Sequence, residues 1–245
     1  MSDRLCIGLL QCGYIDPSLI AEFGDYPEVF ADLFAPFALD LVTYDVQAGQ
    51  VPSDPGACDG WLVSGSASSA YEPLAWIPPL EAFLRTLIEQ ETPLVAICFG
   101  HQLLAQAMGG RVERAPEGWG VGVHEYQVLS SPASGEAWSP STGGADRVGS
   151  TVRLIASHQD QVAGLPDRAE VVARTEHCKV AAYTLGPKAL AIQPHPEFTP
   201  GLSARLMELR RSRIGDDVVD AALASLDQPL DRHLVAAWID DVWRS

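Results

Sequence analysis

Short apolar runs alternate with segments of helical periodicity along the first two hundred residues of the chain. An apolar run without alternation is typical of a strand that is buried on both faces of a sheet. We predict strands at residues 4–11, 39–46, 59–64, 94–97, 111–114, 124–129, 151–156, 169–175, 179–183 and 190–193. Periodic apolar positions predict helices at residues 27–34 and 80–90 and from residue 100 to the glycine pair at 109–110.

This order of elements predicts the α/β class, with a mostly parallel central sheet and helices on both of its faces. In such sheets, ligands bind outside the carboxyl ends of the strands. From Gly201 onward the pattern becomes amphipathic and helical in three successive segments. We therefore predict a main α/β domain at residues 1–200 and a C-terminal helical extension at residues 201–245 that packs on the same domain.

Two surface features are predicted without an assigned function. Residues 130–149 are rich in Ser, Gly and Pro and are expected to form an exposed loop. The arginines at 210, 211 and 213 are expected to lie on a solvated helix face rather than in a binding site.

Composition and charge narrow the classes of partner. The chain has 245 residues, a formal net charge of −16 and a pI near 4.6, a balance that repels nucleic acids and anionic lipid surfaces. No apolar stretch is long enough to span a bilayer, so we expect a cytoplasmic protein. Five cysteines without metal-ligand spacing predict no disulfide framework and no metal site. No cofactor is expected.

One cysteine stands where a predicted buried strand passes directly into a predicted helix. Cys98 follows the apolar run 94–97, and helical periodicity begins at Gly100. The sharp elbow requires small neighbours, here Ala96 and Gly100, and brings the sulfur to the free N–H groups of the helix. Because such an environment activates a cysteine as a nucleophile, Cys98 is a catalytic candidate. The alternative is a buried cysteine that packs as a small hydrophobe.

A histidine and a carboxylate follow another buried strand far downstream. His195 and Glu197 lie two residues apart, with Pro194 and Pro196 holding the chain extended, so both side chains project the same way from the strand end. A base that is held by a third group activates a cysteine nucleophile. His195 and Glu197 are therefore the candidate partners of Cys98, whereas the His-Pro-Glu sequence alone is more typical of a solvated loop.

The segments AICFGHQ and QPHPEF together resemble the class I (triad) glutamine amidotransferase family. The similarity continues through WLVSGSASSAYE, GWGVGVHEY and SHQDQV, so it covers most of residues 1–200 and resembles the stand-alone relatives of the GMP synthetase amidotransferase domain. The resemblance implies a three-layer, flavodoxin-like arrangement of the predicted sheet and helices. Ala96 stands where this family usually has glycine, and we expect a slightly tighter elbow without loss of function.

The resemblance also implies roles for residues around the cysteine. Gly65 and Ser66 follow a predicted strand, and their N–H groups, with that of Phe99, are the candidate oxyanion donors. By composition alone, this loop is equally consistent with a flexible small-residue segment. Gln102 is the candidate substrate contact, the alternative being a surface glutamine.

The SHQDQV segment supplies two further candidates. In the resembling family such a motif sits beside the substrate, so His158 and Asp160 are assigned a supporting role. The alternative is a capped turn with solvated side chains.

These residues predict a glutamine amidotransferase-like enzyme that hydrolyses the side-chain amide of glutamine through a γ-glutamyl thioester on Cys98. No P-loop pattern occurs, so the ammonia acceptor is expected either on another chain, such as a partner synthetase, or to be absent. The alternative is a γ-glutamyl peptidase that acts on γ-glutamyl peptides or conjugates. A second alternative is a catalytically silent regulatory subunit, against which the presence of Cys98, His195 and Glu197 argues.

Overall fold

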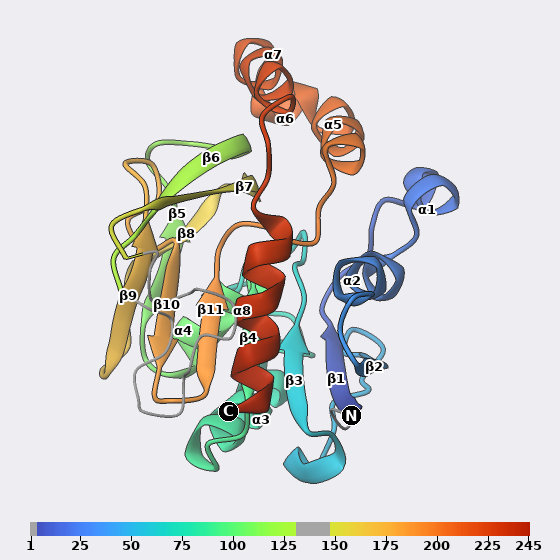
Figure 1. Ribbon diagram of the computed structural model, residues 1–245, viewed down its shortest axis with the longest axis vertical. Helices are drawn as coiled ribbons and strands as arrows, with labels where there is room; N and C mark the ends of the chain where they lie inside the picture. Colours follow the sequence, from blue (N-terminus) through green and yellow to red (C-terminus); the bar gives the residue numbers. More distant parts are fainter. Residues whose placement is uncertain (1–3, 131–147) are drawn as a thin grey trace.

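The computed structural model describes residues 4–130 and 148–245. Within these residues, a nine-stranded sheet has the order β2-β1-β3-β4-β11-β10-β9-β6-β7 (Figure 1). The first five strands in that order are mutually parallel. They are β2 (Leu39–Asp45), β1 (Leu5–Gln11), β3 (Gly60–Val63), β4 (Leu94–Ile97) and β11 (Ala189–Ile192).

The other end of the sheet is antiparallel. It contains β10 (Ala182–Leu185), β9 (Ala169–Arg174), β6 (Gly120–Val128) and β7 (Thr151–His158). A separate antiparallel pair is formed by β5 (Arg111–Arg114) and β8 (Asp160–Gly164). β7 and β8 are separated only by Gln159, so this pair begins where the edge strand of the large sheet ends.

Two apolar clusters cover the two faces of the sheet, and β4 contributes to both. Leu94 and Ala96 belong to one cluster, whereas Val95 and Ile97 belong to the other, as the two-residue period of a strand requires. α3 (Ile77–Glu89) and α4 (Phe99–Ala107) pack in the first cluster. α2 (Tyr26–Phe34) and α8 (Arg232–Arg244) pack in the second, and α8 crosses in front of the sheet in Figure 1.

The remaining helices extend beyond the end of the sheet (Figure 1). They are α1 (Pro17–Phe23), α5 (Pro200–Leu209), α6 (Arg211–Ile214) and α7 (Asp216–Ser225). Separately, a short 3₁₀ helix, η1 (Pro55–Ala57), precedes β3. α7 lies against β6, where a side chain at Gly122 would come within 2.9 Å of the Ala222 backbone. Gly122 also has a φ of +80°, so its lack of a side chain permits both the backbone turn and the close approach.

The predicted α/β class, with helices on both faces of the sheet, is confirmed. Ala96 is fully buried, and β4 continues through it to Ile97. The C-terminal residues form helices as predicted, and α8 returns to the sheet, where the Trp243 indole N–H donates to the Trp61 carbonyl at 3.2 Å. The division at residue 200 stays a prediction.

Several local predictions are wrong. The strand predicted at 124–129 begins earlier, because β6 starts at Gly120. The strand predicted at 179–183 is shifted to Ala182–Leu185, and α1 and β8 were not predicted. The loop predicted at 130–149 lies almost entirely outside the described residues.

Candidate active site

Cys98 occupies a strained elbow between β4 and α4. Its backbone has φ 54° and ψ −101°, a left-handed conformation that costs an L-residue about 1–3 kcal/mol. Its N–H donates to the Ile192 carbonyl of β11 at 2.8 Å, which holds the elbow against the neighbouring strand. A side chain at Gly100 would lie 2.7 Å from Val63 Cβ, so the small residue predicted there is required for packing.

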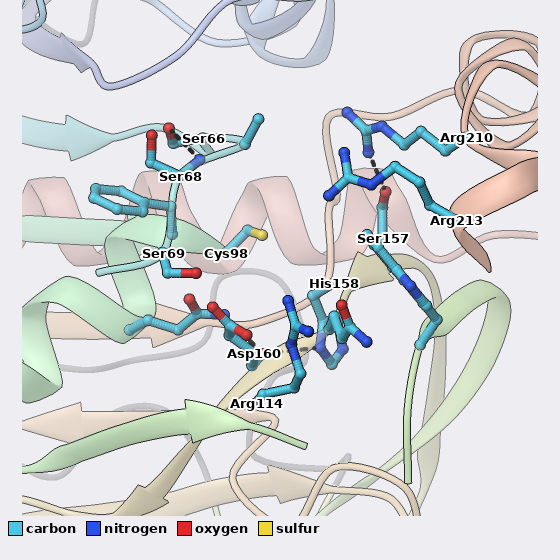
Figure 2. Close-up of a pocket in the computed structure, with 15 residues that line it drawn as sticks. Ser66, Ser68, Ser69, Cys98, Arg114, Ser157, His158, Asp160, Arg210 and Arg213 are labelled. Carbon is cyan, nitrogen blue, oxygen red and sulfur yellow. Dashed lines mark hydrogen bonds between the residues drawn. The ribbon is translucent and has the colours of Figure 1, made fainter. Parts of the chain in front are cut away.

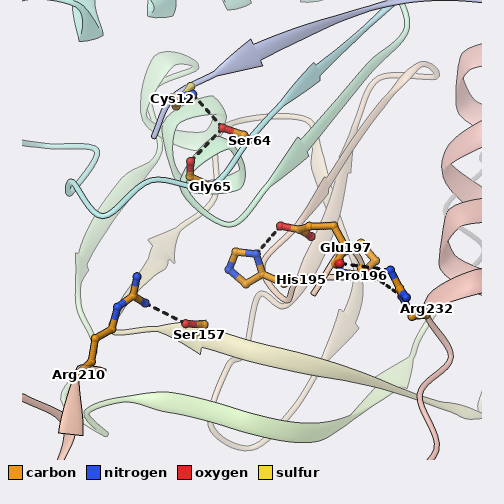
Figure 3. Close-up of polar contacts among 9 residues, drawn as sticks. All are labelled: Cys12, Ser64, Gly65, Ser157, His195, Pro196, Glu197, Arg210 and Arg232. Carbon is orange, nitrogen blue, oxygen red and sulfur yellow. Dashed lines mark hydrogen bonds and ion pairs between the residues drawn. The ribbon is translucent and has the colours of Figure 1, made fainter. Parts of the chain in front are cut away.

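Three contacts fix the position of His195, of which Figure 3 shows the one with Glu197. The His195 N–H donates to the Ile155 carbonyl of β7 at 2.8 Å, and its ring stacks on Phe198 with centroids 4.0 Å apart. Its Nδ1 lies 2.6 Å from Glu197 Oε1. This contact orients the ring and leaves Nε2 as the nitrogen that can exchange a proton with a reacting group.

Opposing effects act on the charge of His195. Burial alone would lower the pKa of its imidazole, but the adjacent Glu197 carboxylate and Cys98 together raise the pKa to about 10. Glu197 is fully buried. A buried carboxylate is stable in a protein only when charge or hydrogen bonds compensate it, and His195 supplies that compensation.

Cys98 and His195 line the same cavity, so the structure brings the three residues predicted from the two motifs into one site. The cavity also contains Tyr26, whose pKa is raised well above its usual value, chiefly by burial. Sequence patterns did not indicate Tyr26, because nothing in its local helix distinguishes it from a core aromatic residue.

Arg232, at the start of α8, holds the chain segment that carries Glu197 (Figure 3). Its Nε donates to the Pro196 carbonyl at 3.2 Å, and its Nη2 donates to the Glu197 carbonyl at 3.3 Å. The same nitrogen lies 3.3 Å from the Asp32 carboxylate of α2. Arg232 therefore ties the Pro196–Glu197 backbone to two helices, a contact that sequence patterns did not reveal.

The candidate oxyanion donors lie next to residues that line this cavity. A side chain at Gly65 would lie 3.1 Å from His195 Cε1 and 2.6 Å from the Tyr26 hydroxyl, so its backbone closely approaches the imidazole. Ser66 lines the cavity with Cys98, and Phe99 is the first residue of α4. Among the described residues, the backbone N–H groups of Gly65 and Phe99 have no hydrogen-bond partner. These groups are free to bind an oxyanion, which stays a prediction.

A second, adjoining cavity also contains Cys98 (Figure 2). Gln102 lines it and is buried, and its amide nitrogen donates to the Asp160 carbonyl at 2.8 Å and to Gln193 Oε1 at 3.1 Å. It is therefore not the solvated surface glutamine of the alternative interpretation.

His158 and Asp160 line this second cavity as well. His158 is buried at the end of β7, where burial and nearby histidines lower its pKa to about 3, and Asp160 is the first residue of β8. Neither residue lies in the solvated turn that was the alternative interpretation.

Three arginines line the second cavity, namely Arg114, Arg210 and Arg213 (Figure 2). Arg213 is exposed, as predicted for a solvated helix face, whereas Arg210 is half-buried at the end of α5. Arg211 does not line the cavity and pairs with Glu208 and Asp220. Sequence spacing alone could not predict which of these arginines line the cavity, because α5 ends and α6 begins on either side of Arg210, where the helix direction changes.

The chain matches the family described as "Glutamine amidotransferase class-I" over residues 35–210, and it belongs to that family. It is 31% identical over 178 residues to gamma-glutamyl peptidase 4 of Arabidopsis thaliana, covering 72% of this chain and 69% of the relative. It is 28% identical over 253 residues to the glutamine-hydrolysing GMP synthase of Corynebacterium jeikeium, covering 91% of this chain but only 44% of the relative.

Solved structures agree with the fold. A glutamine amidotransferase from Thermotoga maritima superimposes with a TM-score of 0.75 at 18% identity, covering 98% of this chain and 99% of the other. A glutamine amidotransferase from Methylobacillus flagellatus gives a TM-score of 0.70 at 21% identity, with 99% and 93% covered. At these identities the likeness concerns the fold alone.

Three further properties concern the described part of the chain. No helix there is both long enough and apolar enough to cross a membrane. No cluster of three or more His, Cys, Asp or Glu side chains suited to a metal ion occurs within those residues. All five cysteines are free thiols.

Proposed function

We propose that this protein hydrolyses the γ-amide bond of glutamine or of a γ-glutamyl compound, with Cys98 as nucleophile, His195 as acid and base, and Glu197 as the residue that orients His195. The observation that carries the proposal is the presence of Cys98 and the His195–Glu197 pair at one cavity, from strand ends about a hundred residues apart. Membership of the class I glutamine amidotransferase family supports it.

The reaction divides into two steps. The thiol proton of Cys98 is held by His195, the Cys98 sulfur attacks the amide carbon, and the C–N bond breaks as His195 gives that proton to the departing nitrogen. Water then attacks the γ-glutamyl thioester and releases glutamate. N–H groups of Gly65 and Phe99 stabilise the negative oxygen in both steps, a contribution of about 3 kcal/mol for each donor.

Two substrate classes fit this chemistry. For glutamine, the departing nitrogen is ammonia, and a synthetase on another chain would use it. This agrees with the GMP synthase relative, less than half of which the chain spans. For γ-glutamyl peptides, the departing group is an amino acid or peptide. The similarity to gamma-glutamyl peptidase 4 favours this second candidate, because it covers more than two thirds of both chains.

The test is a substrate screen of the purified protein with glutamine, γ-glutamylglycine and γ-glutamylalanylglycine. We expect Cys98→Ala to reduce hydrolysis at least about a thousandfold, because it removes the nucleophile. Cys6→Ala is the matched control and is expected to retain full activity, since Cys6 lies on β1 and does not line either cavity.

The outcomes separate the candidate functions. Preference for glutamine supports an amidotransferase, whereas preference for the peptides supports a γ-glutamyl peptidase. Activity that survives in Cys98→Ala would refute the assigned nucleophile. A folded wild-type protein that hydrolyses none of the three compounds would instead support a silent regulatory subunit.

A further inference from the structure

The arginines at the second cavity have no carboxylate partners, unlike other arginines of the adjoining helices. Arg114, Arg210 and Arg213 have no carboxylate within 4.0 Å among the described residues, whereas Arg205 and Arg211 of the adjoining helices pair with acidic side chains. The chain as a whole carries a net charge of −16. A group of unpaired guanidinium ions at one cavity of an acidic protein is a local site for an anion.

Arg210 and Arg213 are held in place without neutralising their charge. Arg210 Nη1 donates to Ser157 Oγ at 3.3 Å, and the Arg213 guanidinium lies over the Trp119 ring, 5.9 Å from its centroid. The two residues are three apart at the α5–α6 junction, where the Arg213 N–H donates to the Arg210 carbonyl at 2.8 Å. Their side chains therefore reach the cavity from the same corner of the fold (Figure 2).

The position of Arg210 indicates which half of the substrate it meets. Arg210 lines both the cavity that contains Gln102 and Asp160 and the smaller cavity that contains His195. Since His195 would protonate the departing nitrogen, the group attached to that nitrogen begins on the His195 side of Cys98. Arg114, which is paired in register with Asp160, lies instead on the Gln102 side, where the glutamyl group would extend.

We propose that Arg210 and Arg213 bind a carboxylate on the departing half of the substrate. The favoured substrates are then γ-glutamyl peptides with a free C-terminal carboxylate, rather than glutamine or γ-glutamyl compounds with a neutral departing group. Arginine suits this role because its planar guanidinium can donate two parallel hydrogen bonds to one carboxylate. This inference rests on the proposed hydrolysis at Cys98 and extends it to the substrate class.

The test compares substrates that differ only in the terminal charge. These are γ-glutamylglycine and γ-glutamylalanylglycine, each as the free acid and as the C-terminal carboxamide. For at least one of the two peptide lengths, we expect the wild-type kcat/KM to be about tenfold or more higher for the acid than for the carboxamide. This is the effect that the loss of a charge-assisted hydrogen bond predicts. Arg210→Gln and Arg213→Gln should bring the ratio of acid to amide close to one, and Arg213→Lys should retain part of it. The control is Arg205→Gln, which alters an arginine already paired with Glu22.

Binding measurements separate this inference from the proposed hydrolysis. Calorimetric titration of Cys98→Ala with each acid and amide reports the preference without turnover. Tighter binding of the acid, lost when Arg213→Gln is added, supports the inference even if wild type is slow. Equal affinity for acid and amide, or no binding of either, would overturn it and leave the role of Cys98 unaffected. It would also be overturned if the arginine variants weakened both forms equally, because the arginines would then bind the glutamyl group's own carboxylate or only shape the cavity.

Discussion

At the scale of single residues, the candidate site depends on positions where the backbone and the charge are both constrained. Cys98 has a positive φ, and Gly65 leaves room for the His195 ring and the Tyr26 hydroxyl. Glu197 is fully buried beside His195. Strain and buried charge both oppose folding, so their concentration at one cavity is the arrangement expected of a site that is maintained for chemistry.

The His195–Glu197 pair should make stability depend on pH in a specific window. Although burial opposes it, Glu197 and Cys98 raise the pKa of His195 from 6.5 to about 10. The folded protein binds the His195 proton more tightly than the unfolded chain does. The contribution of this proton to the free energy of unfolding is therefore complete below pH 6.5 and is lost as the pH rises through about 10. We expect the difference in unfolding free energy between wild type and Glu197→Gln to shrink across that window in urea titrations.

A suitable control for this experiment is Glu125→Gln, which breaks an exposed pair with Arg153 that includes neither His195 nor Glu197. Its effect on the unfolding free energy should be nearly the same at every pH in the window. If the effect of Glu197→Gln is equally independent of pH, the charged interaction between Glu197 and His195 is not the one described above.

At the scale of elements, the site is assembled by strand ends and secured by the C-terminal helix. Cys98 directly follows β4, and His195 and Glu197 follow β11. This placement agrees with ligand binding at the carboxyl ends of parallel strands. The first residue of α8, Arg232, then donates to two carbonyl groups of the segment that carries Glu197. The C-terminal helix therefore contributes to the geometry of the site as well as to the core.

Arg232→Gln should lower kcat about tenfold with little change in KM, because the segment that orients His195 loses two charge-assisted hydrogen bonds. Steady-state kinetics would measure this effect. Arg244→Gln is the matched control, since Arg244 on the same helix also bonds a carboxylate, that of Asp240, and a backbone carbonyl, that of Ala38. Each variant should lose about 1–3 kcal/mol of stability. A similar fall of kcat in both would indicate general destabilisation rather than positioning.

Local patterns predicted the elements that carry the chemistry but not the contacts between distant elements. Cys98 and the His195–Glu197 pair were predictable because each lies at a strand end with a distinctive local sequence. Arg232 and Tyr26 were not, since their roles depend on packing across the fold. β8 was missed because a single residue separates it from β7, so the two strands present no turn signal.

At the scale of the whole molecule, net charge and local charge act in opposite directions. A charge of −16 repels an anionic substrate, whereas Arg114, Arg210 and Arg213 place positive charge at the cavity that contains Cys98. Electrostatic focusing of this kind concentrates a charged ligand at one place on an otherwise repulsive surface. We therefore expect an anionic substrate to approach the protein at this cavity.

The central claim is that Cys98 becomes covalently bound to the γ-glutamyl group during the reaction. The most direct measurement is acid quenching of wild-type protein during turnover of γ-glutamylalanylglycine, followed by digestion and mass spectrometry of the cysteine-containing peptides. The account predicts a γ-glutamyl adduct on the peptide that contains Cys98 and on no other cysteine. Continued hydrolysis with no adduct at Cys98, or with the adduct on a different cysteine, would contradict it.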